Sequence, residues 1–461
     1  MASRTVLDPA PDATSGPDPA SGGPPSEVPT ASVTETAGVV AEVLLPLVAR
    51  GVIRRRPRVV AGLERVDADR RAVDRLRTLR DRYGPGPLRL RLPGRELAIV
   101  LDPEDVHRIL DGDPEPFAPA NLEKRAALAH FQPHGVLVSH GEDRHERRRF
   151  NEVVLDSDQP RHQLAERFVT VAHEEADALL ELAARFGELE WDDFLPAWYR
   201  LVRRVVFGDG ARDDHRLTDD LAELRDRANN AYLLPKDRAT RRRFQRRLAA
   251  HLARAEEGSL AATIAATPGG ERTDPTDQVP QWLFAFEPAG MALFRALALV
   301  ATHPERAAAH LDGDGDDRAA GSRGIILESL RLWPTTPAIL RDTTEPTEWR
   351  GRTVEPGTAM LIYASLFHRD EDRLPGADEF RPGRWDGRPV DPRTDPPLVP
   401  FSAGPGVCPG RNLVLLTTTA MLERLLAEHR PVMADPSRLP AGGPLPSVLD
   451  NFSLRIALPR R

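Results

Sequence analysis

The sequence predicts a mostly α-helical, single-domain protein with a small β region. Stretches with apolar residues at helical spacing occupy most of the chain between residues 160 and 302. Segments typical of strands occur only near the two ends of the chain. No Pro/Gly-rich linker separates two parts of the body, and 461 residues are enough for one large domain with a substantial core.

The N-terminal segment is expected to differ from this body. Residues 1–37 are rich in Pro, Ala, Ser, Thr and Asp, so we predict a disordered tail, followed by the folded domain over residues 38–461. Residues 39–53 are apolar but contain Glu42, Pro46 and Arg50, which makes them too short and too interrupted for a membrane span. They predict a short helix packed on the body. An interfacial anchor ending at residues 54–56 is the alternative.

The elements of the body follow in order. A helix over residues 68–83 ends at the Gly-Pro-Gly-Pro run of residues 84–87. Residues 88–92 and 96–101 predict a hairpin, and Asp102-Pro103 begins a helix. Further helices are predicted over residues 160–186, 191–207, 217–231, 237–255 and 281–302. Strands are predicted near residue 353, at 361–363 and at 454–458.

Charge and cysteine content restrict the function. The 63 basic and 70 acidic residues give a net charge of −7, so nucleic acid is not expected as the main partner. The single cysteine, Cys408, excludes an internal disulfide and a multi-cysteine metal site. A lone thiol is typical of a reducing compartment, and we expect a cytoplasmic protein.

Cys408 lies in an unusual segment. Residues 400–412 are rich in Gly and Pro and therefore predict a constrained loop, followed by an apolar helix over residues 413–426. Such a loop holds a sulfur in one position and turns backbone N–H groups toward it, which favours the thiolate. Ligation of iron is one use of a solitary cysteine that needs this arrangement.

Residues 401–410 read Phe-Ser-Ala-Gly-Pro-Gly-Val-Cys-Pro-Gly and resemble the heme-binding signature of the cytochrome P-450 family. Phe401, Gly404, Cys408 and Gly410 stand at the family's spacing. Three more segments resemble family motifs in the family's order: 141–149 (the helix at the heme edge), 328–331 (Glu-x-x-Arg) and 380–385. The resemblance implies heme b bound between two long helices, with Cys408 as its axial ligand.

Glu328, Arg331 and Arg384 are expected to form a structural cluster. Glu328 and Arg331 stand three residues apart on one helical face and can pair. The resemblance implies that Arg384 arrives from a distant loop and satisfies the remaining carboxylate lone pairs. Because buried charges persist only when they are paired, we interpret the cluster as a lock for the cysteine loop.

Cations are also expected at the heme propionates. The resemblance places Arg341 there. From the heme-edge helix, two alignments compete: the Gly141-Glu142 start selects Arg144 and Arg148, whereas the family's usual His-x-x-x-Arg selects His145 and Arg149. We prefer the first and keep His145 as a candidate. Gly406 departs from the many relatives with His or Arg at that position, so one propionate contact is missing or supplied from elsewhere.

The oxygen-activating helix departs further from the family. In relatives it carries an acid and a threonine that relay protons to dioxygen. Counting back from His303 aligns Glu287 with the acid and Pro288 with the threonine. The rival alignment, through Ala289-Gly290, would delete both groups. Because Pro288 has no N–H, it displaces a carbonyl of the preceding turn, and a bent backbone that admits water is expected to replace the hydroxyl.

The resemblance implies insertion of one oxygen atom of dioxygen into a small apolar organic substrate. Candidate pocket residues are Phe284, Ala285, Ala338 and Ile339. We expect a monomer that receives electrons from a separate ferredoxin and ferredoxin reductase. Two alternatives are a heme-thiolate enzyme that uses peroxide or catalyses rearrangement or coupling, motivated by the missing threonine, and a heme-binding carrier or sensor without turnover.

Overall fold

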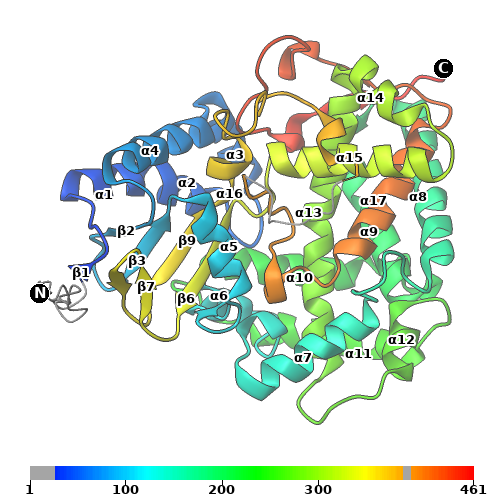
Figure 1. The fold of residues 1–461 in the computed structure, drawn as a ribbon. Coiled ribbons are helices and arrows are strands. Elements are labelled where there is room, and N and C mark those ends of the chain that lie inside the picture. Colours follow the sequence, from blue (N-terminus) through cyan, green and yellow to red (C-terminus); the bar gives the residue numbers. More distant parts are fainter. Residues whose placement is uncertain (1–25, 388–395) are drawn as a thin grey trace, which may run out of the picture.

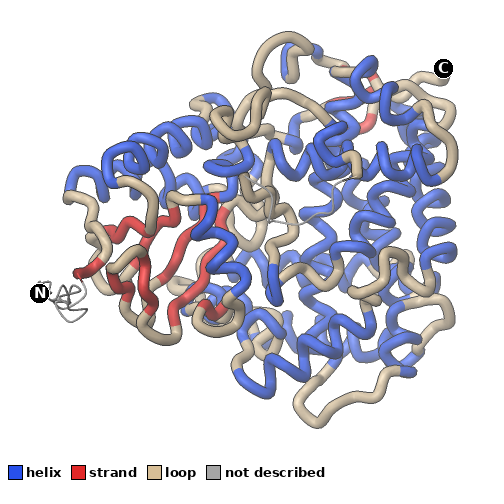
Figure 2. Tube along the Cα trace, in the orientation of Figure 1, coloured by secondary structure: helices blue, strands red, loops and turns tan. Residues whose placement is uncertain are grey.

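The computed structural model describes residues 26–387 and 396–461. Figure 1 shows a large helical part and, beside it, a smaller part in which helices α1, α2 and α4 cover a sheet. Figure 2 shows the same division, with most strands gathered on one side of the molecule. This arrangement is the predicted mostly helical fold with a small β region.

The helices have the following bounds: α1 Val33–Val39, α2 Leu45–Ala49, α3 Pro57–Arg65, α4 Ala68–Tyr83, α5 Pro103–Asp111, α6 Leu122–Leu128, α7 Gly141–Val154, α8 Ala165–Phe186, α9 Trp191–Phe207, α10 His215–Ala228, α11 Arg238–Arg254, α12 Leu260–Ala266, α13 Pro275–Thr302, α14 Pro304–Leu311, α15 Asp316–Leu332, α16 Ala364–His368 and α17 Arg411–Leu426. The strands are β1 Ser26–Glu27, β2 Pro87–Leu90, β3 Leu97–Val100, β4 Phe117–Ala118, β5 Leu189–Glu190, β6 Ala338–Thr343, β7 Thr347–Trp349, β8 Arg352–Val354, β9 Ala359–Tyr363, β10 Val432–Met433 and β11 Arg455–Ala457.

The main sheet joins distant parts of the chain. Its order is β2-β3-β9-β6-β4, so the predicted hairpin β2-β3 pairs through β3 with a strand from the second half of the chain. β6 runs antiparallel to β9, with Leu340 opposite Leu361. Every residue of β3 and β9 is buried because helices and the sheet's own neighbours cover them. The sheet therefore fixes β6, which carries Arg341, against the body.

The long helix α13 forms the centre of the helical part. It packs against α9, α15 and α17, and α8 packs against α9 and α17. Within the two described ranges, α13 alone has the length and hydropathy to cross a membrane, but 83% of its apolar window is buried inside the protein. Its apolar character is thus used for the core.

Residues 26–37 correct the prediction of a disordered tail; residues 1–25 lie outside the described part. Ser26–Glu27 pairs in parallel with β8, and the Ser32 hydroxyl accepts a hydrogen bond from the Glu35 backbone N–H, while Ser32 N–H donates to the Glu35 carboxylate. This capping box starts α1. The average composition of the segment concealed it. Residues 39–53 are largely helical and pack on the body, as predicted.

Candidate active site: a cysteine loop facing a buried helix

A cavity of about 320 Å³ separates the cysteine loop from helix α13. One wall holds Phe401, Cys408 and Gly410, and the opposite wall comes from α13. The predicted pocket residues Phe284, Ala285, Ala338 and Ile339 all line it. The tertiary structure thus brings together residues that lie more than a hundred positions apart in the sequence.

Backbone hydrogen bonds hold Cys408 at the end of its loop. Its N–H donates to the Phe401 carbonyl at 2.9 Å, and its carbonyl accepts from the Arg411 N–H at 3.2 Å, where α17 begins. Gly404 has φ +57°, and a Cβ there would lie 2.3 Å from the Leu110 carbonyl oxygen of α5. Gly404 therefore allows the loop to pack on α5, and it does not itself line the cavity.

Two opposing effects act on the pKa of the Cys408 thiol. Burial raises its pKa above the usual value, whereas a hydrogen bond from the Gly410 N–H and the charges of Arg148 and Arg411 lower it. Burial dominates, so the expectation that the loop alone favours the thiolate needs correction. A metal ion on the sulfur reverses the balance, because a coordinating thiol is deprotonated.

Three arginines lie at one edge of the cavity. Arg144 and Arg148 of α7 and Arg341 of β6 all line it, as the preferred alignment predicts. The Arg148 guanidinium donates to the Val407 carbonyl at 2.7 Å, which ties α7 directly to the cysteine loop. Arg144 and Arg341 both contact Asp113. The structure does not support the alignment that selects His145, because this residue is exposed on α7 and does not line the cavity.

Lys124 joins these arginines. Its ammonium donates to the Pro119 and Leu340 carbonyls at 2.8 and 3.2 Å. Burial lowers the pKa of this lysine to about 7, and the Arg341 charge acts in the same direction. The sequence motifs did not reveal Lys124. The one sequence feature that could have singled it out is the rarity of lysine, because only two of the 63 basic residues are lysines.

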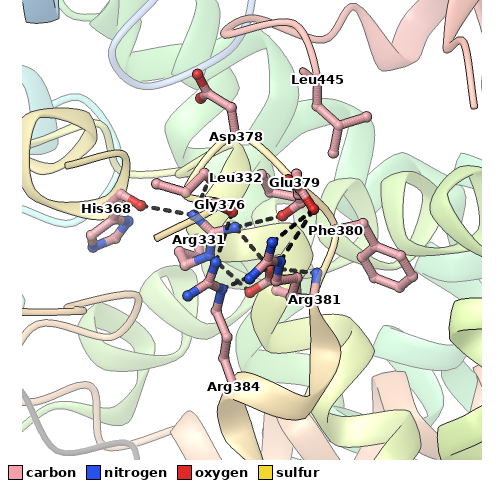
Figure 3. Close-up of polar contacts among 12 residues, drawn as sticks. Arg331, Leu332, His368, Gly376, Asp378, Glu379, Phe380, Arg381, Arg384 and Leu445 are labelled. Atoms are coloured by element: carbon pink, nitrogen blue, oxygen red, sulfur yellow. Dashed lines mark hydrogen bonds and ion pairs between the residues drawn. The ribbon is translucent and has the colours of Figure 1, made fainter. Parts of the chain in front are cut away.

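Glu328 and Arg331 form a buried ion pair on α15, as predicted, with neither side chain exposed. The Arg331 Nε and Nη2 donate to the two Glu328 oxygens at 2.8 and 2.7 Å. The remaining Arg331 donors reach the carbonyls of His368, Ala377 and Glu379 (Figure 3). The pair therefore fixes the chain after α16 to α15.

Arg384 corrects one part of that prediction. Its Nε forms an ion pair with Glu328 Oε1 at 3.8 Å, which is too long for a hydrogen bond. Its Nη2 donates instead to the Pro375 and Gly376 carbonyls, and Figure 3 shows Arg384 near Gly376. The other two hydrogen bonds to Glu328 come from the Arg381 backbone N–H and the Trp385 indole, both at 3.0 Å. Arg384 thus fixes the loop and interacts with Glu328 through its charge. Trp385 makes the hydrogen bond to Glu328 that was expected from Arg384.

Glu287 points away from the cavity. Its carboxylate pairs with the Arg225 guanidinium of α10 and accepts a hydrogen bond of 2.8 Å from the Tyr199 hydroxyl of α9. Burial raises the pKa of Glu287, but the Arg225 charge and these hydrogen bonds outweigh it and leave the pKa lowered. Its predicted role as a proton relay has no support from this position, since the cavity lining does not include it.

Pro288 lines the cavity, and α13 continues through it as one helix. Two residues later, Gly290 leaves room for Trp198 of α9, whose indole donates to the Phe286 carbonyl at 2.6 Å. A Cβ on Gly290 would lie 2.7 Å from the Trp198 ring. The helix opposite Cys408 is therefore fastened to α9 through its backbone. A bend that admits water stays a prediction.

These residues fit a heme. The cavity offers apolar walls, one thiol on the wall formed by the cysteine loop, and a cationic edge, which would suit the faces, the iron and the propionates of that group. Cys408 would hold the iron, and Arg144, Arg148, Arg341 and Lys124 would hold the carboxylates. Among the described residues, no cluster of three or more His, Cys, Asp or Glu could hold a metal ion in another way.

Part of the chain is similar in sequence to known proteins. A family model described as "Cytochrome P450" matches residues 323–440. Cyclooctat-9-en-7-ol 5-monooxygenase of Streptomyces melanosporofaciens is 34% identical over 172 residues, which are 34% of this chain and 37% of that enzyme. The aligned segment thus spans little more than a third of the relative.

Solved structures extend the likeness to most of the chain. The retinoic acid-bound cyanobacterial CYP120A1 matches with a TM-score of 0.66 at 17% identity, over 84% of this chain and 94% of that one. CYP175A1 from Thermus thermophillus matches with a TM-score of 0.62 at 23% identity, over 87% and 97%. With Cys408 lining the cavity, residues 323–440 match the cytochrome P450 family model, and the chain has the fold of these solved cytochrome P450 structures.

Proposed function

We propose that the protein is a heme-thiolate monooxygenase that inserts one oxygen atom of dioxygen into an apolar organic substrate. The observation that carries the proposal is the Cys408 thiol, which faces α13 across the cavity with cations at one edge. When bound, heme b supplies the chemistry of binding and cleaving dioxygen. The residues of this chain hold the sulfur, bind the carboxylates and exclude water.

The lining of the cavity supports an apolar substrate. Phe284, Ala285, Ala338 and Ile339 offer no charge to a ligand above the cysteine. The relative from Streptomyces acts, by its name, on cyclooctat-9-en-7-ol, and CYP120A1 binds retinoic acid. Both ligands are mostly hydrocarbon, and we propose a terpenoid-like carbon skeleton for this enzyme as well. A difference-spectrum screen with terpenoids, steroids, aromatics and fatty acids tests this substrate class.

The test of the ligand is spectroscopic. Reduced protein under carbon monoxide should give the red-shifted Soret band of thiolate-ligated heme. Cys408→Ser keeps nearly the same shape but cannot supply a thiolate, so the variant should lose that band even where it retains heme. Because Cys408 is the only cysteine, a red-shifted band that persists in Cys408→Ser would contradict the proposal.

Electron supply is part of the proposal. We propose a separate ferredoxin and ferredoxin reductase as electron donors, a monomeric enzyme and a cytoplasmic location. NAD(P)H consumption that depends on ferredoxin, reductase and substrate together tests the electron route. Size-exclusion chromatography with light scattering tests the monomer.

One observation favours a second candidate, an enzyme that uses hydrogen peroxide. The α13 residues that line the cavity, all within the described part, are Gln281, Trp282, Phe284, Ala285, Phe286, Pro288, Ala289 and Ala292. None of them is an acid or carries a hydroxyl, the groups that deliver protons to dioxygen in the first candidate. A peroxide-driven reaction begins with oxygen that already carries protons and two more electrons.

Two oxidants separate the candidates. The monooxygenase predicts turnover with ferredoxin, reductase and NAD(P)H, and the second candidate predicts turnover with hydrogen peroxide alone. Pro288→Thr restores a hydroxyl and a backbone N–H on the cavity wall. A many-fold rise in coupled, dioxygen-dependent product formation in this variant would favour the peroxide enzyme as the native activity. An unchanged or lower rate would favour the monooxygenase.

A further inference from the structure

Asp113 is a buried carboxylate in the middle of the cationic edge. It lies two residues after α5, its side chain has no exposed surface, and it lines the cavity. Its Oδ2 accepts a hydrogen bond of 3.0 Å from Arg341 Nε, and its Oδ1 accepts one from Arg144 Nη2. One carboxylate thus bridges two of the three arginines that would hold the propionates of a bound heme.

The cysteine loop leaves space for this carboxylate. A Cβ on Gly406 would lie 2.3 Å from Asp113 Oδ2 and 3.0 Å from Arg341 Nη2. Any larger residue at this position would displace the Asp113–Arg341 contact. Gly406 has no side chain that could contact a propionate. The space that such a side chain would fill is taken by the Asp113 carboxylate and the Arg341 guanidinium.

Basic residues outnumber acidic ones in the lining of the cavity. The four basic lining residues are Lys124, Arg144, Arg148 and Arg341, and Asp113 is the one acidic lining residue in the described chain. Arg148 is also paired with Glu152 of α7, and burial lowers the pKa of Lys124 to about 7. Asp113 is therefore the carboxylate that offsets the charges of Arg144 and Arg341 at this edge. Charges buried at this depth are weakly screened, so one unit matters.

We propose that Asp113 is a positioning residue and fixed counter-ion of the heme site: it holds Arg144 and Arg341 in place for the propionates and lowers the reduction potential of the heme iron. The inference rests on the proposed function. A fixed negative charge stabilises the ferric state, which carries one more positive charge than the ferrous state, and so opposes reduction. Charges placed behind the groups that contact a heme are one of the means by which proteins set its potential.

The experiment is a spectroelectrochemical titration of the heme-loaded protein with dithionite and mediator dyes. Asp113→Asn removes the charge with little change of shape, and its reduction equilibrium should shift by about tenfold toward the ferrous form, which is about 59 mV for a one-electron couple. Asp113→Glu keeps the charge and should stay near the wild-type potential. Asp111→Asn is the matched control, because Asp111 is exposed at the end of α5.

The direction of the shift separates charge from damage. A distorted site that admits water would favour the ferric form, so a lower potential in Asp113→Asn would overturn the inference, as would no shift or an equal shift in Asp111→Asn. Should Asp113→Asn fail to retain heme while Asp113→Glu retains it, the required charge supports the inference. Loss of heme from both Asp113→Asn and Asp113→Glu, while Asp111→Asn retains heme, would show that heme binding depends on the shape of the Asp113 side chain and not on its charge. This result would overturn the inference.

The same preparation tells the two proposals apart. Wild-type protein without a thiolate-type carbon monoxide band would contradict the proposed function and this inference with it. A wild-type band accompanied by identical potentials in wild type and Asp113→Asn would contradict the role of Asp113 alone.

Discussion

The indole Nε1 of Trp385 donates a hydrogen bond of 3.0 Å to Oε2 of the buried Glu328 carboxylate. Glu328 also accepts two hydrogen bonds from Arg331 and one from the backbone N–H of Arg381. A buried charge is tolerated only when its hydrogen-bonding capacity is filled, so each donor in this set matters. The indole makes the contact that the sequence motif assigns to an arginine.

Trp385→Phe should therefore destabilise the protein by about 1.5–3 kcal/mol, the range for hydrogen bonds to charged groups. Trp333→Phe is the matched control, because that buried indole donates at 2.9 Å to the neutral Pro446 carbonyl and should cost about 0.5–1.5 kcal/mol for the hydrogen bond. Urea unfolding of both variants measures the difference. Equal losses would show that the charge of Glu328 adds nothing to the Trp385 bond.

Glu287→Gln should be less stable than the wild type at neutral pH, and the difference in stability should become smaller in acid. The folded-state pKa of Glu287 is lowered from 4.5, because its contacts with Arg225 and Tyr199 outweigh burial. Its contribution is therefore full above about pH 4.5 and is lost as the pH falls through the folded-state pKa. Leaving Arg225 without its partner should cost about 3–5 kcal/mol at neutral pH.

Urea midpoints measured between neutral pH and about pH 3.5 check this prediction. The stability difference between wild type and Glu287→Gln should narrow toward the acid end. Glu305→Gln, on the exposed surface of α14, is the control and should show no such trend. A difference that stays constant with pH would mean that the Glu287 carboxylate is not ionised in the fold.

Gly290→Ala should destabilise the protein by about 1–3 kcal/mol, because its Cβ would overlap the Trp198 ring that fastens α13 to α9. Gly62→Ala is the control. A Cβ at Gly62, within α3, meets nothing within 4 Å and should stabilise the helix by about 0.5–1 kcal/mol. Thermal unfolding compares the two, and an equally stable Gly290→Ala would contradict the close contact.

Binding of hemin by the heme-free protein should strengthen with pH. Burial raises the pKa of the Cys408 thiol, and a thiol must lose its proton to ligate a metal. Affinity should rise by up to about tenfold per pH unit while the thiol is protonated. Lys124, with a pKa of about 7, acts in the opposite direction as it loses its charge.

Comparison with Cys408→Ser isolates the thiol, because this variant keeps Lys124. Absorbance titrations of both proteins with hemin should show the rising affinity in the wild type and not in the variant. The same pH dependence in both would assign the titrating group to another residue.

Local patterns were sufficient for most of the fold. The helix over residues 68–83 begins and ends where the apolar spacing and the Gly-Pro run place it. The hairpin was also correct, because alternation and a turn act within a few residues. The prediction for residues 26–37 was wrong for two reasons. Ser26–Glu27 pairs with β8, a strand more than 300 residues away in the sequence, which no local composition reveals. The average composition also concealed the local capping box between Ser32 and Glu35.

By itself, the sequence indicated the resemblance to the cytochrome P450 family, the mostly helical fold, and the candidate residues Cys408, Glu328, Arg331 and Arg341, because each stands at a spacing that the family motifs share. Only the tertiary structure decided between Arg144 and His145, turned Glu287 toward Arg225, gave Trp385 the contact expected of Arg384, and placed Asp113 between two arginines. The physical reason is common to all four. A buried charge takes whichever donors or counter-charges the packing of distant elements brings within hydrogen-bonding distance, and spacing along the chain does not encode that distance.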